Sequence, residues 1–95
     1  MLRTTPKYKN VEDDFVPPIT LHPAQTKSLD AGEYEAADHV PQLLYDCEPA
    51  SGRADITLNI EELPTENGSV QLVLHVGNFG ISPVTVRIGQ QTRQA

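Results

Sequence analysis

The sequence predicts an all-β fold: a small antiparallel β-sandwich or jelly-roll-like domain with an extended N-terminal arm. Three observations support this prediction. Apolar residues occupy every second position in residues 54–60, 69–76 and 84–88, which is the period of a half-buried strand. Residues that favour turns separate these stretches. No stretch of ten or more residues has the apolar spacing of an amphipathic helix.

Residues 1–18 show no apolar periodicity and are expected to form the arm. Pro17 and Pro18 favour an extended backbone at this point and in the residue before them. The first ten residues hold three basic side chains and no acidic one, whereas the whole chain has a formal net charge of -6. We expect the arm to bind a partner, and a solvated terminus with no such role is the alternative. Its candidate contact residues are Arg3, Lys7, Tyr8, Lys9, Phe15 and Val16.

Three shorter strand candidates follow the arm: residues 19–22, 27–36 and 42–48. The first stops at Pro23 and is predicted as an edge strand, because proline is tolerated there and not in a central strand. In the second, Asp30-Ala31-Gly32 is expected to turn the chain, and a single helical turn over residues 34–38 is the alternative. The third ends in a predicted turn at residues 49–52.

The three alternating stretches between residues 54 and 88 are predicted to form an antiparallel meander with one apolar face. Asn67-Gly68 is expected to turn the chain, because both residues tolerate positive φ. An apolar sheet face needs a cover, and we expect a second sheet made from the three shorter strands. The alternative is a single curved sheet covered by another subunit. These assignments give a β domain over residues 19–90 and a polar tail over residues 91–95.

Gly77 and Gly80 have the spacing of a glycine loop that clamps the phosphate backbone in one RNA-binding module. That use requires basic neighbours and flanking helices, whereas the flanks here alternate like strands and the nearest basic residue is Arg87. We therefore interpret both glycines as positive-φ positions of a strand connection. Phe79 between them is expected to be either buried under the end of the sandwich or exposed as a contact residue.

No catalytic, cofactor-binding or metal-binding residue is predicted. His22, His39 and His75 lack the spacing of metal ligands. Cys47 lies between two acidic residues, which favours an inert buried thiol. The serines lack the Gly-x-Ser-x-Gly pattern of a nucleophile elbow. The acidic net charge argues against nucleic-acid binding, and no apolar run is long enough to cross a bilayer.

The arm and the meander resemble, in general build, the small β-rich decoration or cement proteins of tailed-bacteriophage heads. The resemblance implies an oligomeric protein that docks on a capsid lattice, and it assigns no site residue. We therefore expect a non-enzymatic structural protein of the virion that binds copies of itself or a capsid-like lattice protein, and neither nucleic acid nor membrane.

Residues 76–89, VGNFGISPVTVRIG, are also similar to the strand–turn–strand pattern of immunoglobulin-like sandwiches. That similarity implies the alternative function, a small binding module or an accessory subunit of a bacterial complex. The basic first residues precede no apolar segment, so no signal peptide is expected. We expect assembly into the virion in the host cytoplasm, or residence in the bacterial cytoplasm.

Overall fold

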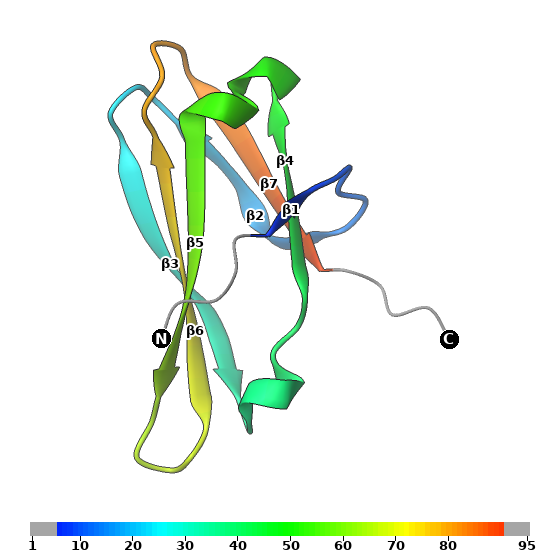
Figure 1. Ribbon diagram of the computed structural model, residues 1–95, viewed down its shortest axis with the longest axis vertical. Helices are drawn as coiled ribbons and strands as arrows, with labels where there is room; N and C mark the ends of the chain where they lie inside the picture. The colour runs from blue at the N-terminus through cyan, green and yellow to red at the C-terminus, as the bar shows by residue number, and fades with distance from the viewer. Residues whose placement is uncertain (1–5, 91–95) are drawn as a thin grey trace.

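A computed structural model describes residues 6–90 and contains two β-sheets packed face to face (Figure 1). One sheet has the strand order β1-β4-β7-β2 and the other has the order β3-β6-β5. The strands are β1 (Lys7–Tyr8), β2 (Asp14–Leu21), β3 (Thr26–Tyr34), β4 (Leu43–Glu48), β5 (Ile56–Pro64), β6 (Val70–Asn78) and β7 (Val84–Gln90). Two short 3-10 helices, η1 (Ala37–His39) and η2 (Ala50–Asp55), connect strands. The predicted all-β fold is confirmed.

The core lies between the two sheets and is mostly aliphatic, with Tyr45 and Cys47 among its buried residues. Alternate side chains of β5, β6 and β7 point inward, as their period-two spacing predicts. The most deeply buried of these side chains are Leu58, Ile60, Leu72, Leu74, Val76, Val84, Val86 and Ile88. Because burying one such side chain stabilises a fold by about 1.5–3 kcal/mol, these residues supply much of the driving force for folding.

The last three strands do not form the predicted meander. β5 and β6 pair in antiparallel fashion around the expected Asn67-Gly68 turn, where Gly68 has φ +84°. β7 instead crosses to the other sheet and pairs with β4 and β2. The reason is that β3 pairs with the free side of β6, so β6 has no edge left for β7. Alternation shows which side chains point inward, and it does not show which sheet a strand joins.

Asp30-Ala31-Gly32 does not reverse the chain. It forms a bulge inside β3, where the pairing with β6 shifts between Asp30 and Glu33. Gly32 has φ +104°, and its N–H donates a 3.0 Å hydrogen bond to Oδ1 of Asp30. The same residue types that favour turns therefore produce a bulge here, because the strand continues on both sides of them.

The described part of the predicted arm belongs to the sandwich. The expected boundary at residue 18 falls inside β2, which pairs with β7, while β1 runs parallel to β4. Val11 between them is buried, and its N–H donates a 2.7 Å hydrogen bond to Oδ2 of Asp46. The expectation of a separate arm is thus wrong for residues 6–18, since strand edges far along the chain supply partners that the local sequence does not reveal. Arg3 and residues 91–95 lie outside the described residues.

Candidate docking loop and polar network

The connection between β6 and β7, residues 79–83, lies at one end of the sandwich (Figure 1, top). Within residues 6–90, the large hydrophobic side chains left exposed are Phe79, which is 67% exposed, and Ile81, which is 95% exposed. Both belong to this connection, which we call the docking loop. Phe79 is therefore an exposed residue rather than a buried one. Apolar side chains gathered in one exposed place are typical of a surface that contacts another protein.

Asn78 fixes the start of the docking loop. Its side chain is fully buried, and Nδ2 donates two 2.9 Å hydrogen bonds, to the carbonyl oxygens of Leu21 and Ser82. Its Oδ1 accepts a 2.9 Å hydrogen bond from the N–H of Gly80. These contacts hold both halves of the loop against the sandwich. A loop that is ordered before binding loses less conformational entropy when a partner docks.

Gly77 and Gly80 are needed because neighbouring side chains lie close to them, and not because the backbone there has a positive φ. Of the glycines in the described part of the chain, Gly32 and Gly68 have positive φ, and the interpretation given above for Gly77 and Gly80 is wrong. A Cβ atom at Gly77 would lie 3.0 Å from Cε2 of Phe79, so the Phe79 ring packs over this residue. A Cβ atom at Gly80 would overlap the side chain of Asp55. Both glycines thus make room for neighbouring side chains.

One acidic side chain, that of Asp55, lies beside the docking loop. The N–H of Phe79 donates a 2.8 Å hydrogen bond to the carbonyl oxygen of Asp55, whose carboxylate lies beside Gly80. Residues 54–86 contain no lysine or arginine.

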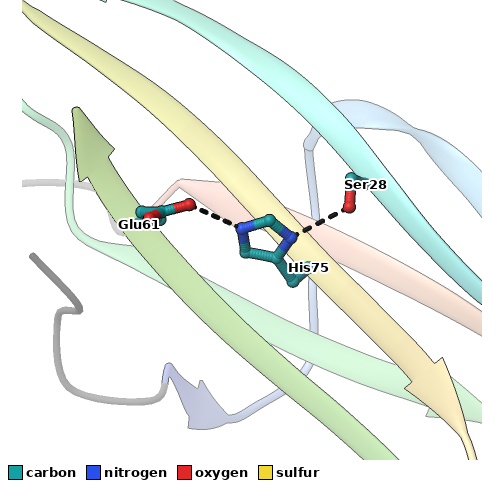
Figure 2. A network of polar contacts seen from close by, with 3 residues as sticks. All are labelled: Ser28, Glu61 and His75. Carbon is teal, nitrogen blue, oxygen red and sulfur yellow. Dashed lines mark hydrogen bonds and ion pairs between the residues drawn. The ribbon is translucent and has the colours of Figure 1, made fainter.

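A polar network crosses the outer face of the three-stranded sheet (Figure 2). One hydrogen bond of 2.9 Å joins Oγ of Ser28 to Nδ1 of His75, and another of 2.9 Å joins Nε2 of His75 to Oε1 of Glu61. The residues come from β3, β6 and β5, and Ser28 and His75 are direct cross-strand partners. The sequence correctly placed His75 on the outer face. It gave no sign of the other two partners, because the strand registers that bring them together are not readable from it.

The same three residue types act as nucleophile, base and orienting acid in serine hydrolases. Such enzymes also need hydrogen-bond donors that converge on the reacting oxygen and a site that excludes water. The His75 and Glu61 side chains are 39% and 34% exposed and lie on an open sheet face. We therefore interpret the network as a cross-strand contact that helps to align the three strands.

Three of the candidate contact residues from the N-terminal segment, Tyr8, Phe15 and Val16, pack against other residues of the same chain. The Tyr8 ring packs edge-on against the Tyr45 ring, with 5.5 Å between the two ring centroids. The Arg53 guanidinium lies over the Tyr8 ring, 4.7 Å from the centroid of that ring. Phe15 and Val16 are partly buried against the core. The side chains of Lys7 and Lys9 are exposed beside β4. Phe79 is thus the aromatic candidate whose ring remains mostly open to a partner.

Cys47 is buried on the inner face of β4. Burial first, and then the negative charge of Asp46, raise the pKa of its thiol to about 11, while Arg53 opposes the shift. A neutral thiol is a poor nucleophile and a poor metal ligand. Within the described residues, no three side chains of histidine, cysteine, aspartate or glutamate converge in a way that would hold a metal ion.

No helix in the described part of the chain is long and apolar enough to cross a membrane. Comparison of the chain with protein-family models, with curated proteins and with solved structures finds no match. Functional inference therefore rests on the surface and contacts of this chain itself.

Proposed function

We propose that this protein is a non-enzymatic structural protein that docks onto a larger protein assembly through the docking loop. The observation that supports this function is the exposure of Phe79 and Ile81, since the other large hydrophobic side chains of residues 6–90 are buried or half-buried. Asn78 holds the loop in place through its hydrogen bonds, so the backbone that carries Phe79 and Ile81 is ordered before a partner binds. A few well-placed aromatic and aliphatic side chains often dominate the energy of a protein interface.

The assembly that we propose is a capsid lattice, with the protein as a decoration or cement component of a virion. The general build supports this setting: the chain is short and β-rich, has one cysteine, and leaves one end of the sandwich apolar. A sandwich with a projecting loop can occupy a repeated site on a lattice without any chemistry beyond packing and hydrogen bonding.

The test follows the tagged protein through a density gradient of lysate from the cell that produces it. Wild type is expected to sediment with a large assembly that contains many copies of one lattice protein. The double variant F79S/I81S is expected to remain with free proteins, because it loses the apolar contact. The control variant F79Y/I81V keeps that contact and is expected to sediment with the assembly.

Two results would contradict the proposal. If F79S/I81S sediments as wild type does, the docking loop does not carry the contact. If wild type itself remains with free proteins, the protein is not part of a large assembly. Circular dichroism of the purified variants shows whether each retains its β-structure.

A further inference from the structure

Asn67 and Gly68 form the tip of the β5–β6 hairpin, at the opposite end of the sandwich from the docking loop (Figure 1). Both residues are exposed. No hydrogen bond or ion pair within residues 6–90 holds the Asn67 side chain, so its amide group is free to rotate. The tip thus presents a side-chain amide to solvent directly before the backbone nitrogen of a glycine.

The residues on either side of the tip are held in place. The N–H of Thr65 donates a 2.9 Å hydrogen bond to the carbonyl oxygen of Ser69, and a 2.6 Å hydrogen bond joins their two hydroxyl groups. The Ser69 hydroxyl also donates to Oε1 of Glu33 on β3. These contacts, which we call the hairpin clamp, fix the base of the loop and leave residues 66–68 exposed beyond it.

The position of Gly68 favours a reaction between its backbone nitrogen and the Asn67 side chain. Asparagine is among the chemically labile residues, because its Cγ atom can close a five-membered ring with the nitrogen of the next residue. Gly68 has no Cβ to crowd this approach, and apart from its chain neighbours no heavy atom lies within 4 Å of the place that a Cβ would occupy. Glycine also changes its backbone angles at little cost, so the tip can reach the geometry of ring closure.

We propose that Asn67 is a site of spontaneous deamidation. Hydroxide removes the proton from the backbone nitrogen of Gly68, and this nitrogen attacks Cγ of Asn67. The bond between Cγ and Nδ2 then breaks, and Nδ2 takes up a proton from water and leaves as ammonia. Water opens the resulting cyclic imide at either of its carbonyl carbons, which gives aspartate or isoaspartate. The reaction consumes one water molecule and requires neither an oxidant nor a cofactor.

One contact opposes the reaction. The N–H of Gly68 donates a 3.1 Å hydrogen bond to the carbonyl oxygen of Thr65, and this bond has to open before the nitrogen can attack. Opening a single exposed hydrogen bond is expected to slow the attack by about tenfold at most. The hairpin clamp stabilises this bond because it holds Thr65 in place. The fold is therefore expected to set the rate of deamidation and not to prevent it.

The other asparagines of the described chain lack these conditions. Asn78 is fully buried, and three hydrogen bonds hold its side chain. Asn10 and Asn59 are exposed, but they precede valine and isoleucine, whose branched side chains crowd the approach of the backbone nitrogen. Deamidation is therefore expected at Asn67 well before it occurs at the other three positions.

Deamidation would change both the charge and the backbone of the hairpin tip. Aspartate or isoaspartate at position 67 adds one negative charge to a chain whose formal net charge is already -6. Isoaspartate also adds a backbone carbon atom to the loop that the hairpin clamp closes. Because the docking loop lies at the other end of the sandwich, the inference does not rest on the proposed function.

The experiment incubates the folded full chain at mildly alkaline pH and follows each asparagine by mass spectrometry of its proteolytic peptides. Asn67 is expected to convert at least about tenfold faster than Asn59, with both aspartate and isoaspartate as products. N67Q is expected to keep its amide, because a glutamine side chain would have to close a larger ring.

The variant S69A tests the role of the hairpin clamp. It removes the hydroxyl that bonds to Thr65 and Glu33, so Asn67 is expected to convert about two- to tenfold faster than in wild type. S51A is the matched control, since Ser51 is exposed in η2 at the other end of the sandwich, and it is expected to convert at the wild-type rate. The rates are compared where circular dichroism shows that both variants keep the wild-type β-structure.

A sample of the same chain unfolded in urea gives the rate without the fold. The inference is overturned if Asn67 stays intact in the folded protein while the unfolded chain converts, or if it converts no faster than Asn59. It is also overturned if aspartate forms without isoaspartate, because direct hydrolysis of the amide would then be the route. A rate for S69A equal to that of S51A would overturn the role of the hairpin clamp.

Discussion

The side-chain amide of Asn78 donates a 2.9 Å hydrogen bond to the backbone carbonyl of Leu21, and this contact joins the three-stranded sheet to β2 of the other sheet. The same amide nitrogen reaches the carbonyl of Ser82, and Oδ1 accepts from Gly80. N78A would leave all three backbone groups without these partners. Because an unsatisfied buried polar group costs about 1–3 kcal/mol, we expect the free energy of unfolding to fall by about 3 kcal/mol.

Urea denaturation of N78A measures this loss. N59A is the control, because Asn59 is exposed on β5 and its replacement is expected to change stability by less than about 0.5 kcal/mol. Equal stabilities of the two variants would show that Asn78 does not stabilise the sandwich.

The N-terminal segment is expected to stabilise the domain. Deletion of residues 1–16 removes β1, the buried Val11 and the first part of β2. It exposes edges of β4 and β7, so the remaining chain is expected to lose its cooperative thermal unfolding transition. The point variant V11A removes one buried side chain of this segment and leaves its strands in place. It is expected to lower the free energy of unfolding by about 2 kcal/mol. K9A is the matched control, since Lys9 is exposed, and a V11A variant as stable as K9A would contradict the expectation.

Cys47 is expected to resist thiol reagents in the folded protein near neutral pH. Its pKa is raised from 9.0 to about 11, first by burial and then by Asp46. In the unfolded chain the thiol ionises more readily, so the stability that it contributes is present below pH 9 and is lost as the pH rises through about 11. The difference in unfolding free energy between wild type and C47A is therefore expected to shrink over this range.

The rate of reaction with a chromogenic disulfide, with and without urea, measures the protection of Cys47 directly. Rapid labelling of the folded protein at pH 7 would show that the thiol is exposed or ionised, and a stability difference that stays constant up to pH 11 would contradict the linkage.

The sequence predicted the inner face of the sandwich well and its connectivity poorly. Leu58, Leu74 and Val86 point inward as their alternation requires, because a side-chain period of two is a local property of a strand. β7 joins the other sheet because β3 already pairs with the free edge of β6. That pairing joins strands that lie far apart in the sequence. Short local patterns do not reveal such competition between strands.

The candidate sites show the same division. Phe79 could be singled out from the sequence because it lies in a glycine-containing connection between two strands, although its exposure could not be decided. The function of Asn78 depends on Leu21, which lies 57 residues away, so no local signal marks it. Tyr8 and Phe15 were predicted to contact a partner because they lie in a segment without apolar periodicity, whereas the folded chain itself packs against them.

The pairing of β2 with β7 has a consequence for the order of events during protein synthesis. Asp14 lies opposite Gly89, and within residues 6–90 β7 is the strand that holds both β2 and β4 in their sheet. While the ribosome is still translating the codons before β7, the nascent chain can form the three-stranded sheet β3-β6-β5, whereas β2 and β4 lack the strand that joins them. β2 and β4 must therefore wait, exposed to chaperones and proteases, until β7 has left the exit tunnel.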